Sequence, residues 1–362
     1  MQITRRDLIR GVCAAGAAAL LPAGRRAGAS PSQPASSPPA GEPFTFVHLT
    51  DMHVTPKRRG DAGYRACIES IRQLRPQPAF VLMGGDMAFD GCAHTKAEFE
   101  EYIRLFKEVS DSLGIPWRPC MGNHDVLGLS PGRKVAIDDP DIGKKMIMDR
   151  LGWKNSYYSF DHAGWHFVVL DSIYPVSTPR GPSYEAKIGP EQLEWLAYDL
   201  GAAKGRPTVA VTHIAAFCNN LQIAANPECK GLGGRVVEDT LQLRTILERH
   251  KVKVLLQGHR HRIEEYRLNG VWYLTSAAAS GAWWAGDWVG SPPGYTVLSC
   301  RGDQLDRTHR TFPWQPHLEP EDKHEAKLIV EHVAFEREQQ RLLEIECAGR
   351  KPWPRQQYFM RR

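Results

Sequence analysis

At residues 115–125 the chain reads IPWRPCMGNHD. The run that ends at Met121 is typical of a strand, and Gly122 gives the backbone freedom to turn where that strand would end. Asn123 offers a neutral oxygen, and His124 an imidazole that can bind a metal, transfer a proton or contact an anion. By itself such a turn is more often a polar loop. It indicates a functional site only if the ends of other strands carry matching metal-binding side chains.

The same order, an apolar run and then a polar or glycine-rich turn, recurs along the chain. Further strands are predicted at residues 44–49, 79–83, 165–170, 208–212, 252–256, 271–275 and 295–300. Helical spacing of apolar residues predicts helices near 64–74, 95–113, 190–200 and 236–250. Strands that alternate with helices indicate an α/β domain, and short apolar runs suit strands that are covered on both faces.

Polar side chains with metal-binding chemistry follow these strands. They are Asp51, His53, Asp86, Asn123, His124, His213, His259 and His261. In open α/β sheets the carboxyl ends of strands share a crevice, so these side chains are expected to meet. The set contains no thiolate, which favours a divalent Mn, Fe, Zn or Co ion over a cysteine-based zinc site. A single histidine could be a satisfied core residue, but burying the whole set without a cation would be costly.

Taken in order, these blocks resemble those of the calcineurin-like metallophosphoesterases over roughly residues 44–300. The matching blocks are DMH at 51–53, GD at 85–86, GNHD at 122–125, His213, and GHRH at 258–261. The resemblance implies an α/β fold built as a two-sheet β-sandwich flanked by helices, to which we add a helical C-terminal extension. It also implies an enzyme that hydrolyses phosphoesters with two divalent metal ions.

The resemblance further implies a role for each residue. Asp51, His53 and His261 would hold one ion, Asn123, His213 and His259 the other, and Asp86 would bridge them. Two such ions would acidify a bridging water to make the attacking hydroxide. His124 would stabilise the phosphate and the leaving oxygen, and Asp125 would orient His124 through a hydrogen bond.

One position separates branches of this superfamily. Purple acid phosphatases carry a tyrosinate ligand where this chain has Phe89. The resemblance therefore favours the cyclic-nucleotide phosphodiesterase and general phosphoesterase branch. On that basis the expected substrates are small-molecule phosphodiesters such as cyclic nucleotides, with a phosphomonoesterase or nucleotidase as the alternative.

An alternative hypothesis is that the chain is not an enzyme but a non-catalytic metal-binding or surface-interaction protein. No metal ligand is missing from the blocks, and a binding protein would have little need of His124. We therefore expect an enzyme.

Two segments are candidate walls of a substrate pocket. Trp283 and Trp284 lie in a glycine-rich loop with a third tryptophan at 288. They could stack on a base, sugar or lipid group, or simply pack the loop onto the domain. Residues 217–234 follow His213 and could supply polar contacts from Asn219 and Asn220.

The N-terminus predicts export. Residues 4–10 read TRRDLIR, an apolar run follows at 11–23, and 27–29 read AGA. This order is typical of a twin-arginine signal peptide at 1–29, with the export machinery as a partner and a bacterial periplasmic or secreted location. The apolar run is too short to remain as a stable membrane anchor. A Pro/Ser/Ala-rich linker is expected at 30–43.

The predicted leader also accounts for most of the net charge. It carries five Arg and one Asp, so the remaining chain has 41 basic and 40 acidic residues, a net charge of +1 instead of +5. No nucleic acid is expected as a partner. The same removal leaves seven of eight cysteines, among which Cys218 and Cys229 could pair or stay reduced.

The remaining chain divides in two. The catalytic domain is expected at 44–302, and 303–362 would be an extension with one charged helix at 321–346 and a basic tail.

Overall fold

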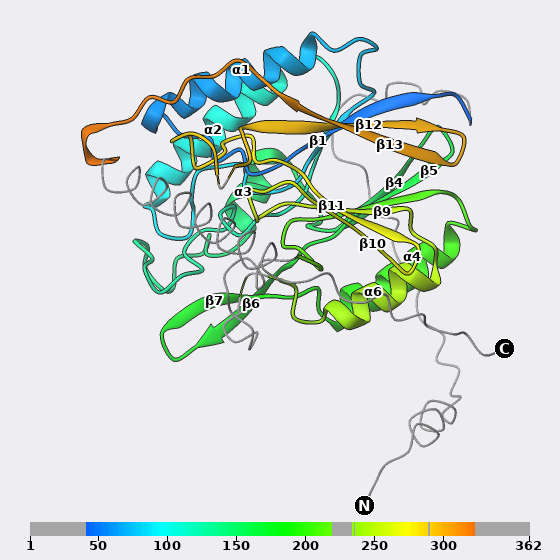
Figure 1. Cartoon of the computed structure of the whole chain (residues 1–362). Helices are drawn as coiled ribbons and strands as arrows, with labels where there is room; N and C mark the ends of the chain where they lie inside the picture. Colours follow the sequence, from blue (N-terminus) through cyan, green and yellow to red (C-terminus); the bar gives the residue numbers. More distant parts are fainter. Residues whose placement is uncertain (1–40, 219–233, 235, 289, 323–362) are drawn as a thin grey trace, which may run out of the picture.

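The computed structural model describes residues 41–218, 234, 236–288 and 290–322. The predicted signal peptide, most of the predicted linker, all but the first two residues of the predicted C-terminal helix and the basic tail lie outside these residues. The described chain forms two mixed β-sheets packed face to face, with helices on both outer faces (Figure 1). The predicted α/β fold, with two sheets flanked by helices, is therefore confirmed.

The first sheet has the strand order β13-β12-β1-β2-β3. β1 (Phe44–Leu49), β2 (Val81–Met83) and β3 (Trp117–Pro119) are parallel. β12 (Gly294–Arg301) pairs antiparallel with β1, and β13 (Gln304–Thr311) pairs antiparallel with β12. This sheet thus continues past residue 302, into the region that the sequence assigned to an extension.

The second sheet has the order β10-β11-β9-β8-β5-β4. Its inner strands are parallel, and its two edge strands are antiparallel to their neighbours. The strands are β4 (Tyr158–His162), β5 (Trp165–Val169), β8 (Thr208–Thr212), β9 (Val254–Gln257), β10 (Glu264–Leu268) and β11 (Val271–Thr275). A separate hairpin is formed by β6 (Ile173–Thr178) and β7 (Gly181–Ala186).

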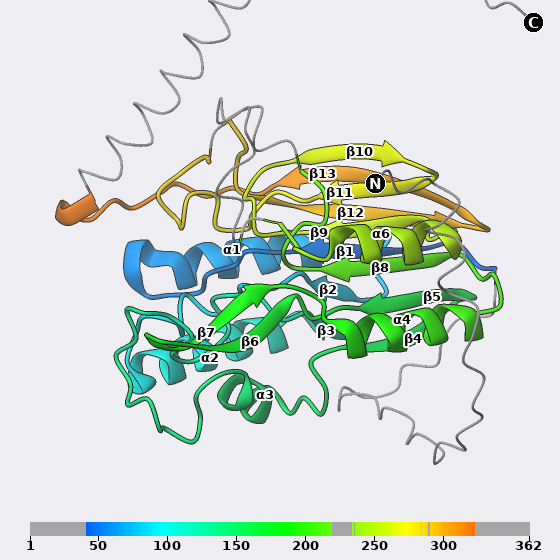
Figure 2. The same ribbon diagram turned by 90° about the horizontal axis from the view of Figure 1, so that it is seen from below.

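Two pairs of helices cover the sandwich. α1 (Gly60–Arg72) packs with α2 (Lys96–Asp111) over the first sheet, and α4 (Pro190–Ala202) packs with α6 (Thr240–Arg249) over the second. Figure 2, seen from below, shows α4 and α6 lying side by side. α2 begins with a capping box, in which the Thr95 and Glu98 side chains and backbone N–H groups bond reciprocally. The short helix α3 (Lys145–Leu151) precedes β4, and within the described residues no helix is long and apolar enough to cross a membrane.

Alternation along β1 explains how each sheet is covered on both faces. Phe44 and Phe46 lie in the layer between the sheets, where Phe46 stacks on Phe80 at 5.3 Å and meets the edge of Phe167 at 5.3 Å. Val47 and Leu49 belong to the other core, which includes the helices. Because successive strand residues point to opposite faces, a run that is apolar throughout serves both cores.

Candidate metal centre

The predicted ligands follow the carboxyl ends of parallel strands in both sheets. Asp51 and His53 follow β1, Asp86 follows β2, Asn123 follows β3, His213 follows β8, and His259 and His261 follow β9. All are buried except His259, which is partly exposed. The structure therefore brings chain segments more than 200 residues apart to one edge of the sandwich.

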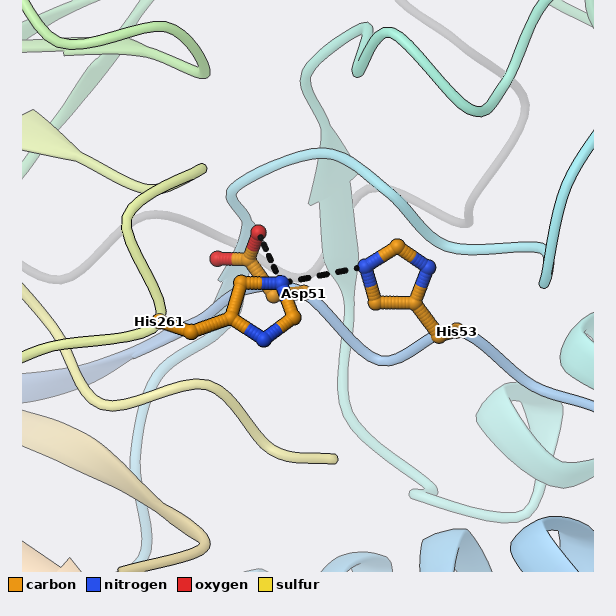
Figure 3. Close-up of side chains that lie close together, drawn as sticks. All are labelled: Asp51, His53 and His261. Carbon is orange, nitrogen blue, oxygen red and sulfur yellow. Dashed lines mark hydrogen bonds and ion pairs between the residues drawn. The ribbon is translucent and has the colours of Figure 1, made fainter. Parts of the chain in front are cut away.

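Asp51, His53 and His261 form the first group. Each offers a ligand atom, and the three atoms lie within 4.8 Å of one another (Figure 3). The two Nε2 atoms of His53 and His261 are 3.2 Å apart, and His261 Nε2 is 3.3 Å from Asp51 Oδ1. The ring Nδ1 of His53 is 3.0 Å from the Phe89 carbonyl, and that of His261 bonds the Gly281 carbonyl.

These carbonyl contacts fix the tautomers. A carbonyl only accepts, so each Nδ1 must carry a proton and donate it, which makes Nε2 the atom of each ring that can offer a lone pair to a metal ion. These two Nε2 atoms lie 3.2 Å apart, and that of His261 lies beside the Asp51 carboxylate. A shared cation would satisfy all three atoms, so this group fits a metal ion.

Asp86, His213 and His259 form the second group. His213 Nε2 lies 3.0 Å from Asp86 Oδ2 and 3.1 Å from Asn123 Oδ1, while its Nδ1 is 2.9 Å from the Gly84 carbonyl. The same Asp86 oxygen lies 3.5 Å from His53 Nε2 in the first group. One carboxylate oxygen thus faces both groups, which is the position of a bridging ligand.

The charges of the centre suit cation binding. Burial lowers the pKa of His53 and of His259 to about 3, so both rings are neutral and able to act as ligands. Burial alone would raise the pKa of the Asp86 carboxyl, but His213 and His124 outweigh it and hold that pKa well below its usual value. Burial also opposes charge on His213, yet Asp86 raises the pKa of that ring to about 9. Asp86 therefore draws positive charge to this place, which a proton on His213 or a bound cation can supply.

His124 lies beside the two groups and is more open than the ligands, with 29% of its side chain exposed. Its Nδ1 is 3.2 Å from Asp90 Oδ1, and its backbone N–H donates to Asp86 Oδ1 at 2.8 Å. The other oxygen of Asp90 lies 3.2 Å from Nδ1 of His94. Burial opposes the charge of His124, but Asp86 and Asp90 raise its pKa to about 8.

Asp125 does not make the hydrogen bond that the sequence predicted. Its carboxylate accepts the backbone N–H groups of Met87, Ala88 and Gly122, at 2.9, 3.2 and 2.9 Å. These bonds tie the loop after β3 to the loop after β2. Among the described contacts, the carboxylate that orients His124 is that of Asp90. The sequence analysis missed Asp90.

The two predicted pocket tryptophans have different positions. The Trp283 ring lies 4.6 Å from the His261 ring and 5.8 Å from the His53 ring, and is only partly buried. Trp284 is fully buried, and its Nε1–H donates to the carbonyls of Met52 and His53. Trp284 is therefore a packing residue and not part of a pocket, and Asn219 and Asn220 lie outside the described residues.

Tyr184 was also missed. It stands on β7 of the separate hairpin. Burial raises the pKa of Tyr184, so it remains a neutral phenol, although the nearby Asn123 side chain acts to lower the pKa of its hydroxyl. The hairpin thereby places Tyr184 near Asn123, one of the predicted ligands.

Comparison with known proteins agrees with this geometry. A family model described as calcineurin-like phosphoesterase matches residues 44–262. A 3′,5′-cyclic-nucleotide phosphodiesterase of Nostoc sp. is 24% identical over 243 residues, covering 65% of this chain and 77% of that protein. A probable glycerophosphodiester phosphodiesterase of Arcobacter nitrofigilis is 23% identical over 257 residues, covering 65% and 78%. Purple acid phosphatase 21 of Arabidopsis thaliana is 25% identical over 239 residues, covering 64% of this chain and 47% of that protein.

Among solved structures, a dimetal phosphatase from Danio rerio has a TM-score of 0.53 at 13% identity. The match covers 74% of this chain and 96% of that one. At this identity the similarity concerns the fold alone.

Proposed function

Because this chain belongs to the calcineurin-like phosphoesterase family and is a hydrolase of phosphoester bonds, we propose that it cleaves phosphodiesters at a centre of two divalent ions. The observation that carries the proposal is the single Asp86 oxygen that faces both groups, 3.0 Å from His213 Nε2 and 3.5 Å from His53 Nε2. The first ion would be held by Asp51, His53 and His261, and the second by Asn123, His213 and His259.

When bound, such a pair of ions acidifies a water and polarises the phosphoryl oxygens. The chain's own residues supply the rest. His124 is held through Nδ1 by Asp90 and its side chain is 29% exposed, so its Nε2 could bind a phosphoryl oxygen or protonate the leaving oxygen. Thr50 and the backbone N–H of His259 donate to the Asp51 carboxylate and fix its orientation.

Support for diesters comes from two relatives. The Nostoc and Arcobacter proteins are both named as phosphodiesterases, and the chain covers more than three quarters of each. Phe89 stands where a purple acid phosphatase would carry its tyrosinate, and this phenylalanine contacts His53 through its carbonyl. Monoesters are the alternative substrates, which the experiment must distinguish from diesters; the Arabidopsis relative is named a phosphatase.

The test is a panel of a phosphomonoester, a linear diester and a 3′,5′-cyclic nucleotide, assayed after chelation and after return of Mn, Fe, Zn or Co singly. We expect chelation to abolish turnover and the diesters to have the highest kcat/KM. Asp86→Asn should lower the metal content, whereas His124→Ala should keep the metal and lower kcat by about 10²- to 10⁴-fold.

Asp303→Asn is the matched control, because Asp303 pairs with Lys253 at the surface. It should change neither metal content nor rate. A wild-type rate on diesters that survives both Asp86→Asn and His124→Ala would refute the mechanism, and faster turnover of the monoester would refute the substrate class.

A further inference from the structure

The loop of residues 281–288 is anchored by one tryptophan and presents another. Trp284 is fully buried against α1, where a Cβ added to Gly60 or Gly63 would lie within 2.6 Å of its ring. Its backbone φ of 70° is in the left-handed region, as is the 48° of Trp283. Bulky residues rarely adopt this conformation, so the surrounding contacts must hold the loop in place.

Those contacts come from two distant parts of the chain. Arg58 forms a bidentate ion pair with Asp322, at 2.9 Å from Nε to Oδ2 and 2.6 Å from Nη2 to Oδ1, and its Nη1 donates to the Trp283 carbonyl at 3.0 Å. Only 12% of the Arg58 side chain and 8% of the Asp322 side chain are exposed. Trp314 also packs edge-to-face on Trp284, with ring centroids 5.7 Å apart.

The segment of residues 312–322 therefore contacts the residues that hold the tryptophan loop, through Asp322 on Arg58 and Trp314 on Trp284. It leaves β13 and ends at a short 3-10 turn, Pro320–Asp322. Glu319 accepts the backbone N–H of Arg58, and Asp322 accepts that of Glu319, so the turn is bonded within itself and accepts from both the backbone and the side chain of the arginine. In Figure 1 this orange segment passes along α1.

Trp283 has the position of a substrate wall. Its indole is 4.6 Å from the His261 ring and 5.3 Å from Trp288, which meets it edge-on. An organic group esterified to a phosphate at the ligand atoms would come to lie against this partly exposed indole. Planar groups gain most from such contact, because ring pairs at centroid distances of about 4.5–7 Å are attractive beyond their burial.

We infer that Trp283 selects substrates with a planar organic group, and that the Arg58–Asp322 pair is the positioning device that sets its ring. The inference rests on the proposed phosphodiesterase function. It assigns the segment of residues 312–322 a part in substrate selection.

The test uses three diesters with the same 4-nitrophenyl leaving group and a methyl, phenyl or thymidine 5′ group on the other ester. Because the leaving group is constant, differences in kcat/KM report on the retained group. In Trp283→Ala the ratio of phenyl to methyl, and of thymidine to methyl, should fall about 3- to 10-fold through KM. Trp283→Phe should restore part of the ratio.

Asp322→Asn and Arg58→Lys should lower the same ratios without loss of metal. The control is Glu265→Gln, which breaks another bidentate pair, with Arg307, between β10 and β13. Hydrogen exchange is the second readout. Asp322→Asn should speed exchange of the loop amides of Ala282, Trp284 and Ala285, which now bond within the loop and to Ser280, and Glu265→Gln should not.

If Trp283→Ala lowers kcat/KM equally for all three diesters, the selection role is overturned. Such a result would mean that Trp283 only supports the predicted metal ligands. The positioning role of the Arg58–Asp322 pair would be overturned if Asp322→Asn and Glu265→Gln gave the same kcat/KM ratios and the same rates of amide exchange in the loop. If the wild type turns over none of the diesters, the proposed function fails and substrate selection fails with it. The exchange comparison then still decides whether the pair holds the loop.

Discussion

Five of the seven predicted ligands have left-handed backbone. Their φ values are 53° at Asp51, 43° at His53, 52° at Asp86, 67° at His259 and 54° at His261. Such residues cost about 1–3 kcal/mol each and persist only where the surrounding structure holds them. Here backbone bonds do so, since Asp51 and His53 donate to the carbonyls of Gly85 and Asp86 at 3.0 and 2.9 Å. The strain turns side chains from several loops toward one point.

Gly122 is needed for a reason that the sequence did not indicate. It is not among the described glycines with positive φ, so freedom to turn is not its role. A Cβ there would lie 2.0 Å from the backbone N of Asp86 and 2.2 Å from its Oδ1. We expect Gly122→Ala to displace Asp86 and to lower both metal content and rate.

Gly201→Ala is the matched control for this change. A Cβ at Gly201 would meet nothing closer than 3.9 Å, so metal content and rate should stay at wild-type levels. Full metal occupancy in Gly122→Ala would show that Asp86 tolerates displacement.

Asp90 gives a second prediction at this scale. Asp90→Asn weakens the bond to Nδ1 of His124, so kcat should fall about 10- to 100-fold with the metals retained. The pH dependence of kcat should also change, because the carboxylate raises the pKa of this ring. His94→Gln, which removes a side-chain partner from the other oxygen of Asp90, should have a smaller effect. A wild-type kcat and pH profile in Asp90→Asn would exclude this positioning role.

At the scale of elements, the sequence predicted the strands that matter for the site. β1, β8 and β11 have the expected bounds, and other predicted strands and helices are shifted by a few residues. These are apolar runs, which are readable because both faces are buried. β13 was missed because its residues alternate between exposed and half-buried, and the hairpin that carries Tyr184 was missed because most of its residues are not buried.

His166 of β5 allows a stability prediction. It bonds Asp161 of β4 and Asp199 of α4, at 2.7 and 2.8 Å. Burial opposes its charge, but the two carboxylates raise its pKa above the usual value. A raised pKa in the folded state stabilises the protein below the unfolded-state pKa of about 6.5, and this contribution is lost as pH rises through the folded-state pKa.

His166→Gln should therefore lower the free energy of unfolding more at pH 6 than at pH 9. Urea unfolding of wild type and variant at both pH values measures this difference. Surface His317 offers a control, because His317→Gln should show no such dependence. An equal loss at both pH values would mean that the charge of His166 does not contribute.

For the whole molecule, convergence of the ligands was predictable and the identity of their neighbours was not. Parallel strands end at one edge, so residues after them meet whatever their distance along the chain. Which carboxylate faces His124, or which arginine reaches Trp283, depends on loop paths that no periodicity encodes. The bond from Arg58 to Trp283 spans 225 residues and that to Asp322 spans 264.

We propose export through the predicted leader as a further prediction at this scale. The order of TRRDLIR, an apolar run and AGA within residues 1–29 motivates it. Fused to a reporter, the leader should direct export that stops when Arg5 and Arg6 are both changed to lysine. Export that continues after this change would exclude the twin-arginine route.

Four of the predicted ligands follow strands of the first sheet and three follow strands of the second. Ions bound there would cross-link the two layers of the sandwich, and by mass action each would stabilise the folded chain by about 2.7 kcal/mol at a hundred times its Kd. The melting temperature should therefore rise stepwise as Mn²⁺ is added to protein whose metal has been removed with a chelator. A melting temperature that does not change with added Mn²⁺ would contradict this. Metal supply would then govern how long the protein survives proteolysis, as well as how fast it works.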